Sequence, residues 1–374
     1  MVGGGPGAFI GDVHRRAAAF DGEFELVAGA FASTPERSFR QGAALGLDGA
    51  RTYGSWAEMA EEEARLPPGD RIEVVSIVTP NHLHVPVARR FLEAGIHVIC
   101  DKPLATSAEE AESLADLVES TRLVFALTHN YTGYPMVKEA RELVRTGRLG
   151  RLRKVVAEYA QGWLHLPIEA SGQKQAEWRQ DPNRAGPSSA LGDIGSHVDN
   201  LVRYVTGLQI ESLCADLTSF VEGRVLEDDA GMLVRYGGGA RGVYVTSQVS
   251  VGEENGLSLR VYGDRAGLVW RQERPNELRV LTADGPAEVW TRGSAYLSEP
   301  SLHNTRLPPG HPEGFIEAFA NVYRNAGRTI GAVLAGTPPE SLDLDFPSVR
   351  EGVRGMHFIE AALKSAEQEG WVAL

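Results

Sequence analysis

The sequence has little cysteine, no long apolar run and a deficit of positive charge. Its two cysteines, Cys100 and Cys214, lie too far apart for a metal or redox motif. No apolar run reaches the roughly 20 residues that span a bilayer, and the N-terminus lacks the basic-then-apolar order of a signal peptide. The net charge of −13 weighs against nucleic-acid or anionic-membrane partners. We therefore expect a soluble cytoplasmic protein with no bound metal.

The length of 374 residues favours two domains. Up to about residue 130, buried apolar runs alternate with amphipathic helical segments, which is typical of a doubly wound parallel sheet. The expected strands are Phe24–Ala30, Ile72–Thr79, Ile96–Cys100 and Leu123–Leu127. The expected helices are Gly11–Phe20, Pro35–Leu45, Ser55–Glu63, Leu83–Ala94 and Ser107–Glu119.

After about residue 150 the apolar pattern alternates with a period of two, which predicts a mostly antiparallel sheet with one face covered. The expected strands are Arg153–Gly162, Ile210–Val221, Ala230–Tyr236, Arg241–Val251, Ser258–Tyr262 and Gly267–Arg271; the expected helices are Ile194–Val205, Glu313–Asn325 and Ser348–Glu367. We place a Rossmann domain at 1–130, a substrate domain at 131–346 and a C-terminal helical segment at 347–374, which could pack back on the Rossmann domain.

The N-terminal stretch MVGGGPGAFIG resembles a stretched dinucleotide-binding fingerprint, formed by Gly3, Gly5, Gly7 and Gly11. Such glycines let backbone N–H groups approach a pyrophosphate at a helix N-terminus. The alternative is a flexible glycine-rich tail. A central Rossmann strand should supply about five residues before the first glycine, but only Met1 and Val2 precede it. We therefore expect the true start codon to lie upstream, with Met1 inside the strand.

The residues that follow the second expected strand should read the cofactor ribose. An acidic residue there favours NAD, whereas this chain has Ser33 and Thr34, with Arg37 nearby. Ser33 and Arg37 favour NADP, although Thr34 and Pro35 also fit a simple helix cap. The cofactor is therefore predicted to be NAD(P), with a lean to NADP.

Two motifs follow buried strands, at the sheet edge where ligands bind in this architecture. Pro80 and Asn81, in TPNHLH, are placed to face the cofactor, and His84 either joins them or only packs against its helix. In Asp101-Lys102-Pro103, a lysine at a strand end can hydrogen-bond a substrate hydroxyl, although the same tripeptide also forms surface turns.

Asp193 and His197 are four residues apart in GDIGSHVDN, so one helical face would carry both. A carboxylate that orients an imidazole and raises its pKa suits general acid–base chemistry near neutral pH. The alternative is a helix-capping aspartate beside a structural histidine. No third ligand accompanies the pair, so it does not indicate a zinc site.

The order of these motifs resembles the glucose–fructose oxidoreductase, inositol dehydrogenase and rhizopine-catabolism (Gfo/Idh/MocA) family. The resemblance rests on the glycine turn, TPNHLH, DKP, HNY at His129–Tyr131 and GDIGSHVDN, and it covers essentially the whole chain. It implies an N-terminal Rossmann domain, a C-terminal α/β domain with a large, open, mostly antiparallel sheet, and a homodimer or homotetramer formed through that sheet.

The resemblance also implies roles for particular residues. Asp101 stands where the family has a glutamate, and Lys102 matches the family's catalytic lysine, which hydrogen-bonds the reacting oxygen. His197 corresponds to the general base, and Asp193 to the residue that binds a neighbouring hydroxyl and orients His197. Further residues are implied near the ligands. Asn130 and Tyr131 are implied near the nicotinamide, with Tyr131 also contacting the substrate, and Trp178 and Arg179 are implied near the cofactor or substrate. The residues implied at the substrate are Trp163, His165, Lys174 and His311.

The leading interpretation is an NAD(P)-dependent oxidoreductase that transfers hydride to or from a carbon of a sugar, sugar derivative or cyclitol. Two alternatives stay open at this point. One is a non-catalytic nucleotide-sensing regulator with the same fold, against which Lys102, Asp193 and His197 argue because a sensor needs no proton-transfer groups. The other is a redox-cofactor-dependent glycosidase, which would regenerate its cofactor in place.

Overall fold

The computed structural model describes residues 1–374, apart from the side chain of Lys174. Two compact units divide the chain: Met1–Asn130 with Phe319–Val353, and Tyr131–Ala318 with Arg354–Leu374. The first division falls between Asn130 and Tyr131. Residues 319–346, which the sequence analysis assigns to the substrate domain, lie instead in the first unit.

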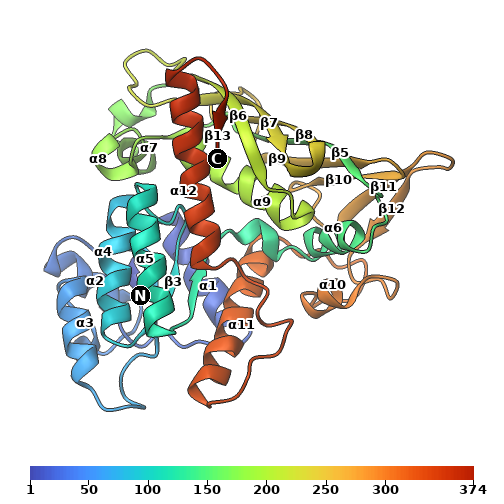
Figure 1. Cartoon of the computed structure of the whole chain (residues 1–374). Coiled ribbons are helices and arrows are strands. Elements are labelled where there is room, and N and C mark those ends of the chain that lie inside the picture. Colours follow the sequence, from blue (N-terminus) through green and yellow to red (C-terminus); the bar gives the residue numbers. More distant parts are fainter. The chain divides into compact units, whose positions relative to one another are not determined.

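The first unit is built on a parallel sheet with strand order β1-β2-β3-β4. Its strands are β1 (Val2–Gly3), β2 (Val74–Val78), β3 (His97–Cys100) and β4 (Phe125–Leu127). Its helices, coloured blue to teal in Figure 1, are α1 (Phe9–Phe20), α2 (Pro35–Ala44), α3 (Trp56–Arg65), α4 (His84–Glu93) and α5 (Ala108–Thr121). β2 and β3 are mainly apolar and mainly buried, because helices cover both faces of a doubly wound sheet.

The prediction of a strand at Phe24–Ala30 is wrong for most of its length. Gly29 and Ala30 form isolated bridges to Thr52 and Val2, and residues 24–28 carry no strand assignment within the described chain. Two-residue β1 offers residues 24–28 no neighbour with which to form a ladder. An apolar pattern alone therefore does not make a strand, because strand pairing needs a partner backbone.

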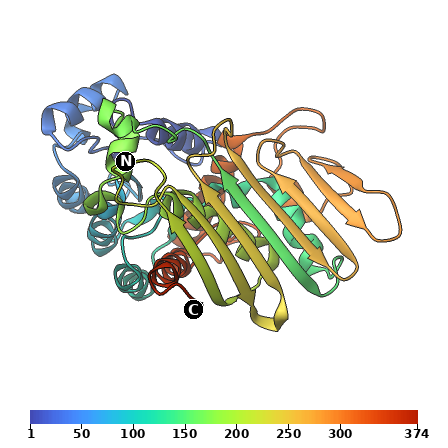
Figure 2. The same cartoon turned by 90° about the horizontal axis from the view of Figure 1, so that it is seen from above.

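The second unit is built on a large sheet with strand order β12-β11-β10-β9-β5-β8-β7-β6-β13. Neighbouring strands are antiparallel except β5 and β8, which pair in parallel. The strands are β5 (Leu152–Ala160), β6 (Ile210–Thr218), β7 (Asp229–Tyr236), β8 (Arg241–Ser247), β9 (Gly256–Gly263), β10 (Ala266–Arg271), β11 (Glu277–Thr282), β12 (Glu288–Thr291) and β13 (Val372–Ala373). Figure 2 shows the long strands of this sheet lying side by side.

Helices of the second unit cover one face of its sheet. α9 (Ser196–Thr206) packs on β5 and β9, and α6 (Pro135–Arg145) packs on β10 and β11. The alternation along β7 matches this arrangement, because Met232 and Val234 are buried while Leu233 between them is 53% exposed. The unit also contains α7 (Lys174–Arg179), α8 (Pro182–Ala185) and α10 (Glu299–His303).

Two C-terminal helices contribute to both units. The first four residues of α11 (Phe315–Leu334) belong to the second unit and the rest of the helix to the first. The first five residues of α12 (Val349–Glu367) belong to the first unit and the rest to the second. Within the first unit, the Leu127 N–H donates to the Pro347 carbonyl at 2.8 Å, and Ser348 bridges to Ala126. These contacts explain why residues 319–353 belong with the parallel sheet. Among the described residues, no helix is both long and apolar enough to cross a membrane.

Candidate active site

The glycine-rich loop makes a tight turn between β1 and α1. Gly4 has φ +69°, which favours glycine, and a Cβ on Gly11 would lie 2.4 Å from the Gly4 Cα. A Cβ on Gly5 would similarly meet the Phe31 carbonyl oxygen at 2.5 Å. Ala8 occupies the N-cap of α1, where its methyl group cannot accept a hydrogen bond from the first-turn N–H groups. The first turn of α1 therefore keeps donors suited to a phosphate.

Ser33 and Arg37 lie where the sequence places the ribose-reading residues. Both are exposed, on the short segment after Ala30 and in the first turn of α2. Ser38, between the loop and the core, accepts a hydrogen bond from the Phe31 N–H and donates one to the Tyr53 carbonyl. Ser38 thus anchors the segment to the core, while the Ser33 hydroxyl and the Arg37 guanidinium are exposed to solvent.

His84 links the two strand-end motifs of the first unit. Its Nδ1 lies 2.7 Å from the Pro103 carbonyl oxygen and its Nε2 lies 2.9 Å from the Thr79 carbonyl oxygen. Burial lowers the pKa of this imidazole. Its ring nitrogens are engaged by the backbone, so the structure supports the packing alternative for His84. Asn81 is buried beside it at the start of a 3₁₀ turn, and Pro80 is partly exposed.

Asp101 fixes the turn that carries Lys102. Its Oδ1 accepts hydrogen bonds from the Lys102 backbone N–H and the Thr128 hydroxyl, both at 2.9 Å. Burial alone would raise the pKa of Asp101, but the nearby His14 imidazole and the charge of Lys102 hold it well below its usual range. An ionised carboxylate therefore sits directly beside the lysine.

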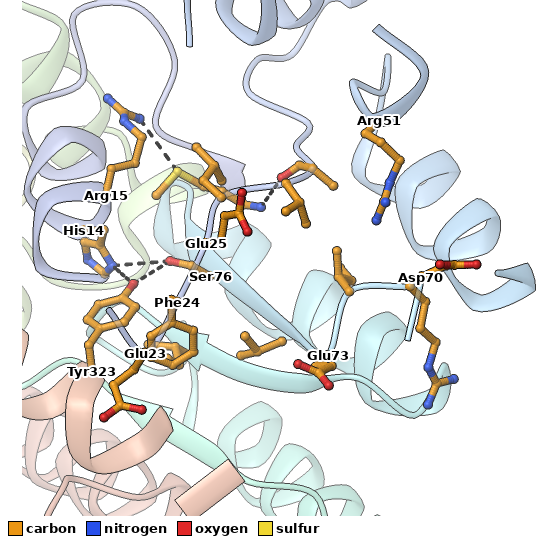
Figure 3. A pocket seen from close by; sticks show the side chains of 18 of the residues that line it. His14, Arg15, Glu23, Phe24, Glu25, Arg51, Asp70, Glu73, Ser76 and Tyr323 are labelled. Carbon is orange, nitrogen blue, oxygen red and sulfur yellow. Dashed lines mark hydrogen bonds between the residues drawn. The ribbon is translucent and has the colours of Figure 1, made fainter. Parts of the chain in front are cut away.

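A buried network supports Asp101 from beneath. His14 of α1 lies 3.9 Å from Asp101, through Nε2 and Oδ1, and its Nδ1 is 2.7 Å from the Tyr323 hydroxyl. The Tyr323 hydroxyl is also 2.7 Å from the Ser76 hydroxyl on β2 (Figure 3). Sequence reasoning missed this set, because Tyr323 is 309 residues from His14 and no local spacing connects them.

The HNY segment ends the first unit with two buried polar side chains. Burial lowers the pKa of His129 to about 3, with the nearby Lys102 charge adding to the effect. Asn130 is buried too, and its Nδ2 has no hydrogen-bond partner among the described residues. A buried donor without a partner is costly in a folded protein, so this amide is suited to a bound acceptor group.

In the second unit, Asp193 lies in a π-helical turn, Leu191–Gly195, that directly precedes α9, whereas the sequence places Asp193 and His197 on one face at the start of a regular helix. Glu227 holds this turn, because its Oε1 accepts from the Ser188 hydroxyl and the Ser189 and Leu191 N–H groups at 2.8–2.9 Å. Burial raises the pKa of Glu227. π-turns of this kind are frequent at functional sites.

Two side chains hold the Asp193 carboxylate. Its Oδ2 accepts from Arg179 Nε at 3.0 Å and from Gln248 Nε2 at 2.9 Å. Gln248, at the end of β8, also donates to Gln161. Sequence reasoning missed Gln248, because its bond to Asp193 joins residues 55 positions apart and no local motif marks it. The structure thus gives Asp193 a fixed orientation and an adjacent positive charge.

His197 is buried in the first turn of α9, against aromatic rings. Its ring centroid lies 4.7 Å from that of Tyr131, in an edge-to-face arrangement, and 6.3 Å from that of Tyr159. The hydroxyls of these two tyrosines are 2.5 Å apart, and Asn255 accepts from Tyr159 at 2.6 Å. Burial raises the pKa of Tyr131, so its hydroxyl stays protonated at neutral pH.

The Trp178–Arg179 pair lies beside Asp193. The Arg179 guanidinium is 4.4 Å from the Trp178 ring centroid and 5.8 Å from that of Trp163. Trp163 donates to Gln161, which brings this residue into the same network as Gln248. The structure therefore gathers Trp163, Trp178 and Arg179 around Asp193, within one unit.

The other predicted substrate residues are less closely connected to this network. His165 is exposed and its Nδ1 lies 2.7 Å from the Gly162 carbonyl oxygen. His311 is exposed in a turn near Pro308. Lys174 begins α7, but its side chain lies outside the described part of the structure. Roles for these three residues stay predictions.

The residues of the first unit fit a nicotinamide dinucleotide. The cradle that a Cβ on Gly5 or Gly11 would fill matches the close approach of backbone to pyrophosphate, and α1 begins directly after it. The unpartnered amide of Asn130 adds a donor at the carboxyl end of β4. These features define a dinucleotide-binding oxidoreductase fold with a separate α/β unit that carries an Asp–His pair.

Comparisons with known proteins identify the family. Residues 1–142 match the oxidoreductase family with an NAD-binding Rossmann fold, and residues 137–269 match the GFO/IDH/MocA C-terminal domain. An uncharacterized oxidoreductase of Bacillus subtilis, YfiI, is 35% identical across 100% of this chain and 95% of its own length. The chain belongs to the Gfo/Idh/MocA family, as the motif order predicts, and it is an NAD-binding oxidoreductase.

Solved structures of related proteins agree with the described fold. An inositol dehydrogenase homolog from Azotobacter vinelandii in complex with NAD⁺ has a TM-score of 0.95 and 39% identity, covering 100% of this chain and 96% of that one. The same homolog with NADH and myo-inositol has a TM-score of 0.91. A levoglucosan dehydrogenase from Pseudarthrobacter phenanthrenivorans is 29% identical over 88% of this chain and 86% of its own length.

Proposed function

We propose that this protein oxidises a hydroxyl group of a sugar, sugar derivative or cyclitol, or reduces the corresponding ketone. The observation that carries the proposal is that one unit holds Asp193 through Arg179 and Gln248 and packs His197 against Tyr131, while the other unit matches an NAD-binding Rossmann fold. Several polar groups around one carboxylate suit a ligand with several hydroxyls. The relatives named for inositol and levoglucosan support the same class.

We assign three side chains to the reaction. His197 accepts the hydroxyl proton at a ring nitrogen during oxidation and returns it during reduction. Asp193 binds a neighbouring hydroxyl of the substrate and orients His197. The Lys102 ammonium donates a hydrogen bond to the reacting oxygen and stabilises negative charge there. A bound nicotinamide supplies the hydride chemistry.

The experiment that tests this function is a substrate panel of inositols, hexoses and anhydrosugars, followed through the absorbance of reduced nicotinamide. We expect turnover with at least one polyol. Dinucleotide binding without turnover of any panel member would favour the regulatory alternative. Consumption of a glycoside without accumulation of free reduced cofactor would instead favour the glycosidase alternative.

We also infer a preference for NADP. Exposed Ser33 and Arg37 can hydrogen-bond a 2′-phosphate, and no acidic residue stands between Phe31 and Pro35 to repel it. Arg37→Ala is then expected to weaken NADP binding about tenfold while changing NAD affinity less than about twofold, as titration calorimetry would measure. The matched control is Arg40→Ala, an exposed arginine of the same helix. Equal losses for both dinucleotides would contradict this assignment.

For the quaternary structure we propose a homodimer or homotetramer formed through the open face of the large sheet. Leu233 and Val245 expose apolar side chains there, at 53% and 36%. Apolar side chains on a sheet face that helices leave open are typical of protein–protein contacts. Light scattering of the purified protein measures the state directly.

A further inference from the structure

The connection between β6 and β7, residues 219–228, contains a buried arginine. The side chain of Arg224 is 1% exposed, and Asp228, which is fully buried, accepts from its Nη1 at 3.1 Å. Asp228 also accepts from the Phe220 and Val221 N–H groups at 2.8 and 3.1 Å, so it fixes the shape of the connection around the arginine. A buried guanidinium is costly unless its donors are satisfied, so the other partners of Arg224 show what it holds in place.

Those partners all belong to one loop, residues 162–171. Arg224 Nη1 donates to the Leu164 carbonyl at 2.7 Å, and Nη2 donates to the Leu166 carbonyl at 2.9 Å. Nε and Nη2 donate to the two carboxylate oxygens of Glu169 at 2.8 and 3.0 Å. These bonds lower the pKa of Glu169, which is therefore ionised at neutral pH. One side chain thus ties three points of the loop to the β6–β7 connection.

Leu164 is held through both of its backbone groups. Its carbonyl accepts from Arg224, and its N–H donates to the Gln248 carbonyl at 3.0 Å. Its side chain is fully buried. Its two neighbours in the chain, Trp163 and His165, are the residues of this loop that are predicted to contact the substrate. Because adjacent peptide units are planar and rigid, the position of Leu164 limits the directions in which both side chains leave the loop.

The same connection holds the turn that carries Asp193. Glu227, next to Asp228, accepts at Oε1 from the Leu191 N–H of that turn at 2.9 Å. The Asp228 carbonyl accepts from the Gln248 N–H at 2.9 Å, and Gln248 Nε2 donates to Asp193. Consecutive residues of one short connection therefore position both the Asp193 carboxylate and the loop of residues 162–171.

Trp163 joins this loop to the surroundings of Asp193. Its Nε1 donates at 3.1 Å to Gln161 Oε1, which also accepts from Gln248 Nε2 at 3.2 Å. Its ring centroid lies 5.8 Å from the guanidinium of Arg179, which donates to Asp193. An indole beside a carboxylate and amides offers an apolar wall next to groups that bind hydroxyls, which suits the ring of a cyclitol or sugar. A shift of the loop would therefore change the shape of the substrate site.

We propose that Arg224 is a specificity-determining positioning residue. By tying the loop of residues 162–171 to the β6–β7 connection, it sets where Trp163 and His165 lie relative to Asp193, and so decides which polyols the site accepts. Its five hydrogen bonds go to the loop and the connection, so it acts through them rather than on the substrate. The proposal rests on the proposed function, because it takes this unit to bind the substrate.

Arg224→Lys is the variant that tests this role. It keeps the charge but replaces a planar fork of five donors by a single ammonium, which cannot reach all of these acceptors. We expect KM for the best panel substrate to rise about tenfold and kcat to change less than about threefold. The ratio of kcat/KM between two polyols should change by about fivefold or more. Partial unfolding would scale kcat for every substrate by one factor and leave that ratio unchanged.

Two further variants complete the comparison. Arg241→Lys is the matched control, because Arg241 is an exposed arginine that donates to backbone carbonyls at the start of β8. It should leave KM and the ratio within about twofold. Glu169→Gln removes one charged partner of Arg224 and leaves the others, so it decides by the same ratio, with about a twofold change, if Arg224→Lys does not fold. An unchanged KM and an unchanged ratio in a folded Arg224→Lys protein would overturn the proposal.

Hydrogen exchange tests the loop without any substrate. In Arg224→Lys the Leu164 amide should exchange at least about tenfold faster than in the unaltered protein, whereas Val243 of β8, which pairs with a strand on each side, should change little. Unchanged exchange at Leu164 would overturn the proposal even if no panel member is turned over. Faster exchange in the variant, together with no turnover by the unaltered protein, would support the positioning of the loop and count against the proposed polyol substrate alone.

Discussion

Replacing His197 by alanine is expected to lower kcat by about 10²–10⁴-fold, because the variant loses the group that moves the hydroxyl proton. Steady-state kinetics on the best panel substrate measures this loss. Dinucleotide affinity should change less than about twofold, since His197 lies among Tyr131 and Tyr159 in the second unit rather than in the phosphate-binding loop. Calorimetric titration with the cofactor separates the two effects.

A matched control tests whether the loss of any histidine side chain would lower kcat. His357→Ala removes an exposed imidazole from α12 and should leave kcat within about twofold. Retention of full turnover by the His197 variant would refute the assignment of the general base. A Tm drop accompanied by lost dinucleotide binding would indicate damage to the fold, and His197→Gln, of more similar polarity and size, would then be compared.

Lys102→Met is the second substitution with a large expected effect. It keeps most of the side-chain volume but removes the ammonium, so kcat should fall by about 10²–10³-fold, the usual loss when one donor to a developing oxyanion is removed. The Asp101 carboxylate should remain ordered, because its bonds to Thr128 and to the residue-102 backbone N–H do not involve the lysine side chain. Single-turnover kinetics at saturating cofactor measures the chemical step.

Lys364→Met is the control for Lys102→Met, as an exposed lysine in the last turn of α12. It should retain turnover and stability. If Lys102→Met reduced KM and kcat in proportion, or left both unchanged, the lysine would not act on the reacting oxygen. Lys102→Arg adds a further comparison, because it restores a charge with a different shape and should recover only part of the rate.

Sequence reasoning reached much of the fold because its signals are local. β2, β3 and β4 are apolar runs, and each lies within two residues of its predicted bounds. The strand predicted at residues 24–30 failed for a non-local reason, since its pairing depends on β1. The π-turn at Leu191–Gly195 could not be predicted from its local sequence, because it is stabilised by Glu227, whose carboxylate accepts from the N–H of Leu191, 36 residues earlier in the chain.

The candidate site divides in the same way. Lys102, Asp193 and His197 are predicted from short motifs in a characteristic order, and their roles in the reaction stay predictions. Gln248 could not, because its bond to Asp193 joins residues 55 positions apart on different elements. The role of His84 required its two carbonyl partners, which only the folded backbone supplies. Residues that position a site are generally harder to predict than residues that act in it.

The composition of the first unit has a consequence for synthesis on the ribosome. The strands of its sheet come from the first 130 residues, but the unit also includes residues 319–353. Within the unit, Tyr323 hydrogen-bonds His14, and the Pro347 carbonyl accepts from the Leu127 N–H. Although domains generally fold in order as they emerge, this one must wait for nearly the whole chain. The nascent N-terminal segment therefore stays incomplete throughout most of translation, and a chain that ends before Tyr323 would lose the hydroxyl that links His14 to Ser76.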